Sequence, residues 1–441
     1  MSPADRILLR SSTTENTGPD MGILLGRALA MDYHKVVVAT DLMKSSTMMK
    51  EALVAGLLSA GVDVIDIGVA SGPVIGMAAS KGDCAVLVTE YRRSNMISGY
   101  LLINSDGSLF RKEQIRHLGR IFIEPLTLPG ADELGHVTRY TTATEEYNSR
   151  VKKMIIHSPG CSVILNCDCG PTSESAPMLL NMVGADVMTL NAQRDRDYST
   201  NDSGDELTDN TDVKEIVKSN AGCIGITMNR IGTMISVVDE KGEVLTDDQI
   251  FAIIIMKAHP SSIAVPIDTS LVILDAFNGL PKDQDRKIVT TDMSAGDVCS
   301  AVSEGASLGY YEGGIIFGGT SMMPDGIRSA TAIATIAGNE SLNTLAGKLT
   351  VCYNDTKEID CDCSPDSFIR AMDGSMEDIS GTLSSVDCSW RVDMESGWFL
   401  ISLIKGESPT VIIRAESRDR VYLLGLMEIA SDLVDDCIRG P

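Results

Sequence analysis

The chain has 441 residues, which is too many for one hydrophobic core, so several domains are expected. Acidic residues outnumber basic ones by 61 to 37, and the resulting net charge of -24 argues against nucleic acid as a partner. The longest apolar runs, such as residues 251–256, are far shorter than the roughly 20 residues that cross a bilayer. The first residues also lack the charged-then-apolar order of a secretion signal, so we expect a cytoplasmic protein without a membrane partner.

The first third of the chain alternates strand and helix patterns. Runs of β-branched and apolar residues predict buried strands at residues 35–40 and 84–89, with another strand after Gly61. Apolar residues at helical spacing predict a helix that begins near Ser45 and Ser46, both of which suit an N-cap. This order of elements predicts an open α/β sheet with right-handed crossovers.

Two further rounds of the same pattern follow. The second contains strands at residues 162–167 and 223–228, and the third starts at Ser262 and ends in a helix over residues 326–337. The tail differs, because short strands precede one amphipathic helix over about residues 420–437. The predicted fold is α/β, with three successive α/β/α domains and a small C-terminal α+β domain.

Eleven cysteines are present, and several occur in runs that predict buried strands, so reduced thiols are expected. Two Cys-x-Cys pairs, Cys167/Cys169 and Cys361/Cys363, can in principle bind a soft metal. Zinc ribbons space their thiolates more widely and add further ligands, and the five histidines are scattered singly. We therefore expect no structural metal site.

Local matches to one family run in order along the chain. The segment MGILLGRALA resembles that family's first helix, and VVVATDLMKSSTMMKEALVAGLLSAGVDVIDIGVASGP reads through its Gly-x-Asp-x-Arg-x-Ser-Ser and Gly-x-x-Pro-Thr-Pro region. Three later segments also match, GYLLINSDGSLF, VVDEKGEVLTDDQ and PDGIRSATAIATIAG. The chain thus resembles the α-D-phosphohexomutases, which include phosphomannomutase, phosphoglucomutase and phosphoglucosamine mutase.

The resemblance implies four domains, each carrying one functional loop. Domain I with the phosphoserine loop is predicted at residues 1–145, domain II with the metal loop at 146–258, domain III with the sugar loop at 259–355, and the C-terminal domain with the phosphate loop at 356–441. In this family a phosphoserine donates its phosphate to a phosphosugar, and the resulting bisphosphate reorients and returns its other phosphate. Magnesium held by three aspartates supports the serine.

The family's catalytic loop, Thr-Ala-Ser-His-Asn-Pro, aligns with residues 89–94 without a gap. Tyr91 stands at the nucleophile position, and its ring displaces the oxygen from the place that in-line phosphoryl transfer requires. No catalytic residue of the family is therefore intact. Arg92 and Arg93 can hold a phosphate, although a solvated turn with ion pairs to Glu90 is the alternative.

The metal loop, Asp-Gly-Asp-x-Asp-Arg, aligns with residues 229–234, and the three aspartates are replaced by Asn229, Ile231 and Thr233. Asparagine and threonine supply only neutral oxygens, isoleucine supplies none, and Arg230 adds an opposing charge. We predict no metal ligand and no cofactor here. Magnesium is expected only if the family chemistry is retained.

The two sugar-phosphate loops are altered as well. In the sugar loop, Glu312 can accept hydroxyl hydrogen bonds and Tyr310 and Tyr311 can stack on a sugar, or the segment is simply a glycine-rich turn. In the phosphate loop Lys405 is the remaining cation, and we expect it to point to solvent. Lys44 replaces an arginine of domain I. Its ammonium can neutralise the charge of a phosphate, but it cannot form the two parallel hydrogen bonds that a guanidinium forms.

These losses together predict a non-catalytic phosphohexomutase-like protein of carbohydrate metabolism, acting as a binding or regulatory subunit. Its partner would be an active mutase paralogue or a sugar phosphate. The alternative is an active phosphosugar mutase, an intramolecular phosphotransferase, with a rebuilt magnesium-independent site made of Lys44, Arg92, Arg93 and Glu312. A third hypothesis is a binder of another anionic metabolite in an inter-domain cleft.

Overall fold

The structure is a computed structural model that describes residues 7–8, 18–93, 95–121, 127–156, 160–194, 210–281, 285–376, 379–405 and 408–439. The chain divides into two compact units. The first contains Met1–Ala264, Asp285–Val289 and Ser294–Gly347, and the second contains Val265–Gln284, Thr290–Met293 and Lys348–Pro441. The predicted four-domain boundaries stay a prediction.

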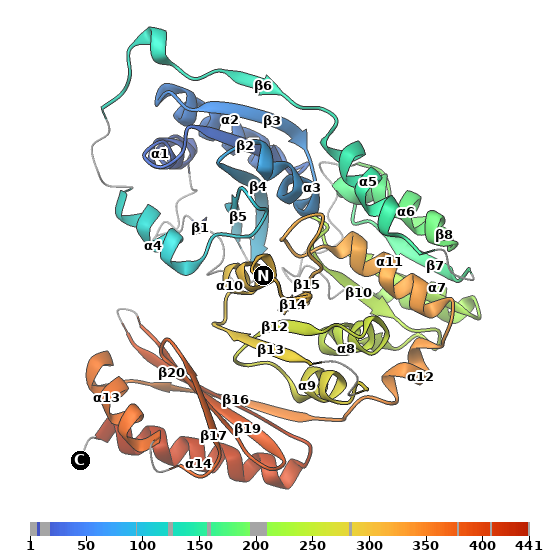
Figure 1. Ribbon diagram of the computed structural model, residues 1–441, viewed down its shortest axis with the longest axis vertical. Coiled ribbons are helices and arrows are strands. Elements are labelled where there is room, and N and C mark those ends of the chain that lie inside the picture. Colours follow the sequence, from blue (N-terminus) through green and yellow to red (C-terminus); the bar gives the residue numbers. More distant parts are fainter. Residues whose placement is uncertain are drawn as a thin grey trace. The chain divides into compact units, whose positions relative to one another are not determined.

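Four sheets follow one another along the chain, and some of their strands are connected by helices and others directly by hairpins (Figure 1). Their strand orders are β1-β5-β4-β2-β3-β6, β11-β10-β9-β7-β8, β13-β12-β14-β15 and β16-β20-β19-β18-β17. This confirms the mixed α/β fold class that the sequence predicts. The helix over residues 420–439 is the longest of those described, and no described helix is both long and apolar enough to cross a membrane.

The strands are β1 (Ile7–Leu8), β2 (Lys35–Thr40), β3 (Asp63–Val69), β4 (Cys84–Arg93), β5 (Asn95–Asn104), β6 (Val137–Arg139), β7 (Ser162–Asn166), β8 (Asp186–Leu190), β9 (Cys223–Met228), β10 (Ile235–Val238), β11 (Val244–Leu245), β12 (Ser262–Pro266), β13 (Lys287–Thr291), β14 (Leu308–Tyr311), β15 (Gly314–Ile316), β16 (Tyr353–Asp360), β17 (Thr382–Val386), β18 (Ser389–Asp393), β19 (Gly397–Ile404) and β20 (Thr410–Ser417). The α-helices are α1 (Pro19–Leu29), α2 (Lys44–Ser59), α3 (Gly72–Ala78), α4 (Lys112–Ile121), α5 (Ala143–Met154), α6 (Ser175–Val183), α7 (Thr211–Ser219), α8 (Asp247–Ala258), α9 (Leu271–Asn278), α10 (Ala295–Ser303), α11 (Gly326–Ala337), α12 (Leu342–Ala346), α13 (Pro365–Met376) and α14 (Arg420–Arg439).

The first sheet is built around β2, which pairs in parallel with β3 and β4. Its residues Val36 and Val38 are fully buried in one core with Leu53 and Leu57 of α2. The predicted strand over residues 35–40 is therefore confirmed. Helix α2 begins at Lys44, so the expectation that a serine caps it was wrong.

The N-cap of α2 is Met43, whose own backbone N–H donates to the Asp41 carboxylate at 2.9 Å. The loop that follows β2 is thus held by the aspartate, and this moves the helix start upstream of both serines. Strand β4 also extends past its predicted end, and its backbone pairs with β5 as far as Arg93 opposite Asn95. The backbone of the catalytic-loop positions therefore runs in an antiparallel hairpin.

In the second unit, α13 and α14 pack on the sheet of β16 to β20 (Figure 1). Alternate residues of β19 face opposite sides, as strand geometry requires. Phe399 and Ile401 join the core with α13 and α14, whereas Trp398 and Leu400 pack against Leu271 of α9. The sheet is therefore covered on both faces.

Candidate functional site

The turn aligned with the metal loop connects β9 to β10. Asn229 is fully buried, and its side-chain oxygen accepts hydrogen bonds from the backbone N–H groups of Thr233 at 2.8 Å and Met234 at 3.0 Å. Its side-chain nitrogen donates to the Thr233 hydroxyl at 2.9 Å. The polar groups of Asn229 and Thr233 are thus engaged with one another and with the turn's own backbone.

Two helix starts from elsewhere in the first unit hold this turn. The backbone N–H of Gly72 donates to the Ile231 carbonyl at 2.8 Å, and that of Gly326 donates to the Gly232 carbonyl at 3.0 Å. A Cβ atom at Gly326 would lie 2.9 Å from the backbone nitrogen of Met234, so the contact depends on glycine there. The turn is therefore fixed by α3 and α11 as well as by its own hydrogen bonds.

These residues do not fit the magnesium ion that the family resemblance implies. Magnesium prefers six oxygen ligands in octahedral geometry and is usually anchored by carboxylates. Ile231 is buried and has no side-chain oxygen, and the Asn229 oxygen already accepts two hydrogen bonds. Within the described ranges, no group of three or more His, Cys, Asp and Glu residues is arranged to bind a metal.

Arg230 links this turn to two other loops, a role that sequence reasoning missed. One guanidinium nitrogen contacts the Met43 sulfur at 2.6 Å, and another lies 3.9 Å from the Asp168 carboxylate. Asp168 and Cys169 both adopt positive φ, at 48° and 52°, which non-glycine residues rarely do. The alignment alone could have drawn attention to Arg230, because this arginine stands where the family's metal-loop motif has glycine.

The junction between β2 and α2 keeps the residues that match the family. Asp41 is fully buried and accepts a hydrogen bond from the Thr89 hydroxyl at 2.8 Å. The hydroxyls of Thr40 and Ser46 are buried and have no hydrogen-bond partner. Lys44, a predicted phosphate contact, is exposed at the first position of α2.

Glu312, the predicted sugar contact, is exposed at the tip of the β14–β15 hairpin. It has a φ of 42°, and Gly313 follows with a φ of 81°, as in the two-residue turns that favour tight hairpins. Tyr310 is buried, donates its hydroxyl to Asp248 at 2.6 Å and stacks on Phe251 with ring centroids 4.8 Å apart. The expectation that Tyr310 stacks on a sugar was therefore wrong, because its ring is part of the interior.

Other predicted residues stay predictions. The side chains of Tyr91, Arg92 and Arg93 lie outside the described residues, as does Ser94 at the end of the aligned segment 89–94. Lys405, in the second unit, is exposed as expected. Within that unit the neighbouring strand β20 uses Arg414 to pair with Asp268, at 2.5 Å, so this arginine belongs to the scaffold.

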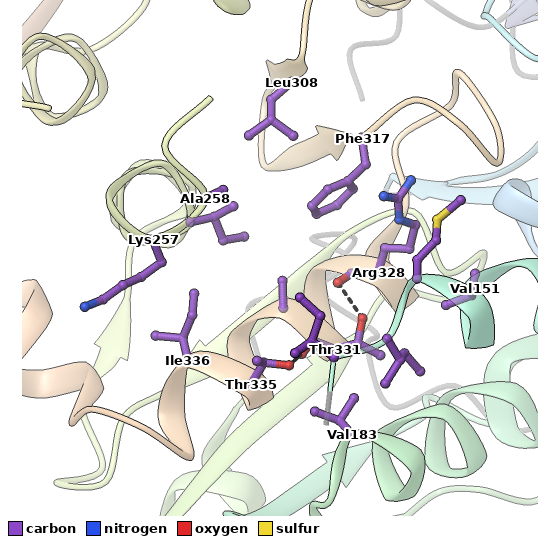
Figure 2. Close-up of a pocket in the computed structure, with 15 residues that line it drawn as sticks. Val151, Val183, Lys257, Ala258, Leu308, Phe317, Arg328, Thr331, Thr335 and Ile336 are labelled. Atoms are coloured by element: carbon purple, nitrogen blue, oxygen red, sulfur yellow. Dashed lines mark hydrogen bonds between the residues drawn. The ribbon is translucent and has the colours of Figure 1, made fainter. Parts of the chain in front are cut away.

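A cavity of about 300 Å³ lies in the first unit between α5, α6, α8 and α11 (Figure 2). Its walls are mostly apolar, and the hydroxyls of Thr331 and Thr335 donate to backbone carbonyls of α11. The Lys257 ammonium points away from the other labelled side chains (Figure 2), and it forms an ion pair with Glu340. Of the described residues, those predicted to bind substrate do not line this cavity.

Comparison with known proteins gives a consistent result over the whole chain. A family model described as phosphoglucomutase/phosphomannomutase, alpha/beta/alpha domain I, matches residues 7–125. A probable phosphoglucosamine mutase of Methanococcoides burtonii is 28% identical over 93% of this chain and 94% of its own length.

Solved structures share the fold. A phosphoglucomutase/phosphomannomutase family protein from Burkholderia thailandensis has a TM-score of 0.78 at 19% identity, covering 98% of this chain and 96% of that one. An N-acetylphosphoglucosamine mutase of Aspergillus fumigatus, in complex with GlcNAc-6P and magnesium, has a TM-score of 0.51 at 11% identity, covering 87% and 94%. The domain I match, the relatives aligned over more than nine tenths of the chain and the shared fold agree, and the chain is similar to α-D-phosphohexomutases along its whole length.

Proposed function

We propose that this protein binds a phosphosugar of the hexosamine phosphate class without performing the magnesium-supported phosphoserine transfer, and that it acts as a binding or regulatory subunit. The observation that carries the proposal is the turn over residues 229–234. Asn229 and Thr233 hydrogen-bond to each other and to the turn's own backbone, and a metal is not needed to hold it. A fold does not carry its function where the site has been replaced.

The proposal rests on how phosphoryl transfer works. The reaction depends on positioning and on neutralising charge that develops on the transferred group. At the aligned positions Asn229, Ile231 and Thr233 bring no negative charge to hold a divalent cation. Arg230 adds a fixed positive charge at the same turn, but it sits against Met43 and faces Asp168.

Phosphosugar binding can persist without the transfer step. Lys44 lies in the first turn of α2, where the helix dipole also favours a negative group. Glu312, exposed at its hairpin tip, can accept hydrogen bonds from sugar hydroxyls. These two residues, with Arg92 and Arg93, are the proposed contacts of the bound phosphosugar.

A second candidate is an active phosphosugar mutase with a rebuilt site that works without magnesium. The full-length similarity to proteins named phosphoglucosamine mutase favours it, since 93% of this chain aligns with 94% of one relative. Its nucleophile would be found near residues 89–94. An Arg92→Ala/Arg93→Ala variant with full turnover would exclude that loop from this activity.

The binding half of the proposal is tested by calorimetric titration with glucosamine 6-phosphate, with glucosamine as the control that lacks phosphate. We expect binding of the phosphosugar only, and at least about a tenfold weaker affinity for Lys44→Gln, as for loss of roughly 1.4 kcal/mol of binding energy. Lys405→Gln is the matched control from the second unit and should match the parent affinity under the same conditions. Equal affinity of the parent for glucosamine, or no binding of either compound together with no co-purifying mutase, would overturn the proposal.

A further inference from the structure

The sequence Cys-Asp-Cys occurs twice, at residues 167–169 in the first unit and at residues 361–363 in the second. The first copy follows β7, and the second lies between β16 and α13. Because the two copies have the same chemistry and spacing, differences in their surroundings decide whether either one can react. Each copy therefore serves as a control for the other.

The second copy brings its two thiols into contact. The Cys361 and Cys363 sulfur atoms are 3.5 Å apart. Cys361 is buried in the core of the second unit, whereas Cys363 is only partly buried and lies at the edge of that core. A disulfide has its sulfur atoms about 2.05 Å apart, so these two sulfur atoms are already within about 1.5 Å of bonding distance.

The first copy has a different setting. Cys167 is fully buried, and Cys169 is 2% exposed. Burial raises the pKa of the Cys167 thiol to about 12 and also raises the pKa of the Cys361 thiol, so the two copies differ in access: Cys169 is buried, whereas Cys363 is partly exposed. Asp168 and Cys169 are also held in left-handed backbone conformations by the surrounding loop. A dissolved reagent therefore has little access to these thiols in the folded protein.

We propose that Cys361 and Cys363 form a reversible disulfide and make this segment a redox-sensitive site. The oxidant is a low-molecular-weight disulfide. The partly exposed Cys363 thiolate attacks it, forms a mixed disulfide and releases one thiol of the reagent. The Cys361 sulfur then attacks the Cys363 sulfur and releases the second thiol, so that the two protons lost by the cysteines appear on two reduced reagent molecules.

The cysteine pair lies beside the segment that aligns with the family's phosphate loop. The backbone N–H of Cys361 donates to the Pro409 carbonyl at 2.9 Å, and the neighbouring Asp360 pairs with Thr410 at the end of β16 and β20. Pro409 ends the segment aligned with the family's phosphate loop, residues 402–409. The disulfide would therefore form directly beside that segment, whether or not the protein binds a phosphosugar.

The test uses the aspartate between each pair of cysteines. The full-length protein is incubated with oxidised glutathione at neutral pH, free thiols are alkylated, and the protein is digested with a protease that cleaves before aspartate. Cleavage before Asp362 separates Cys361 from Cys363 unless a disulfide joins them, and cleavage before Asp168 does the same for the first copy. Mass spectrometry then reports which fragments remain linked.

We expect linked fragments, 2 Da lighter than the two free thiols, for Cys361 and Cys363, and two alkylated thiols for Cys167 and Cys169. Reduction with dithiothreitol should restore both thiols of the second pair. Cys363→Ser should abolish the link, while Cys388→Ser, which removes another partly buried thiol of the same unit, should leave it intact. A stable glutathione adduct on Cys363 without the link, two alkylated thiols at the second pair, or equal linkage of both copies would each overturn the proposal.

Discussion

Two loops of the first unit, each at the end of a strand, differ in how far they keep the family's residues and in how well their buried polar groups are hydrogen-bonded. The turn after β9 has lost the three aspartates of the family motif. The side chains of Asn229 and Thr233, which replace two of them, hydrogen-bond to each other and to the turn's backbone. The junction after β2 keeps the family's aspartate and serines, yet it leaves the hydroxyls of Thr40 and Ser46 buried without partners.

This difference separates structural from chemical roles. Buried polar groups are normally hydrogen-bonded, and an unsatisfied one costs about 1–3 kcal/mol. The turn at residues 229–234 carries no such cost, so we interpret it as a structural element that replaced a metal loop. The junction after β2 does carry this cost, because the hydroxyls of Thr40 and Ser46 are buried without partners. We therefore expect any remaining affinity for a ligand to come from residues near this junction.

The largest effect should come from breaking the turn. Asn229→Leu removes the acceptor of the buried Thr233 N–H and of the partly buried Met234 N–H, so we expect a loss of about 3 kcal/mol in the free energy of unfolding. Urea denaturation measures it. Asn229→Asp keeps an acceptor oxygen and should lose about half as much. A loss below about 1 kcal/mol for the leucine variant would mean that the turn does not depend on this residue.

Restoring the family's ligands should restore its need for a metal. The triple variant Asn229→Asp/Ile231→Asp/Thr233→Asp places three carboxylates in one buried turn, so it should be destabilised in chelator and regain stability with magnesium. At a concentration 100 times the dissociation constant the gain should be about 2.7 kcal/mol. Thermal melts with and without magnesium measure it, and the parent should show no such shift. A magnesium-dependent shift of the parent would contradict our interpretation of the turn.

The helix that holds the turn should make stability depend on pH. Asp325 caps α11 and accepts the Tyr147 hydroxyl at 2.8 Å, and burial raises the pKa of its carboxyl. The folded state therefore favours the protonated form. Its stabilising contribution is complete below the unfolded pKa of about 4 and falls as pH rises through the folded pKa.

Unfolding free energies from pH 4 to 7 check this sign. The parent should lose stability with rising pH relative to Asp325→Asn, and the change should be smaller than that caused by Asn229→Leu. Tyr147→Phe removes a donor to the charged carboxylate, so the decline should extend to higher pH in that variant. A parent that gains stability over this range relative to Asp325→Asn would show that the pKa of Asp325 is lowered instead.

The smallest effect should come from the junction. Thr40→Val removes a hydroxyl that has no partner and keeps the shape of the side chain, so the free energy of unfolding should stay within about 0.5 kcal/mol or rise. Thr89→Val is the matched control, because it removes a hydrogen bond to the Asp41 carboxylate and should cost about 2 kcal/mol. Equal losses in the two variants would remove the contrast between satisfied and unsatisfied hydroxyls.

The elements could be predicted largely from the sequence, because local patterns determine them. The strand over residues 35–40 and the last helix, expected over about residues 420–437 and found over 420–439, follow from β-branched runs and helical periodicity. The contacts of Tyr310 could not be predicted in this way. Its partners Phe251 and Asp248 lie about sixty residues away in the chain, and only the fold brings them together.

The same limit applies to Arg230 and to α9. The alignment shows that Arg230 replaces a glycine, but its contacts with Met43 and Asp168 arise from three separate loops. Residues 265–284 group with the C-terminal segment because Leu271 packs on Trp398, a pairing with no local sequence signal. The structure shows how the replacements at Asn229 and Thr233 are held, which the sequence alone could not predict.

Phosphorus NMR of the purified protein with glucosamine 1-phosphate or 6-phosphate tests the central claim most directly. The assay includes a catalytic amount of the sugar bisphosphate, is run with and without magnesium, and has an active phosphoglucosamine mutase beside it. We predict no interconversion above buffer under either condition, while the control enzyme reaches equilibrium. Turnover by this protein would contradict the account, and Tyr91 and Ser94 would then be the first residues to replace in the search for its nucleophile.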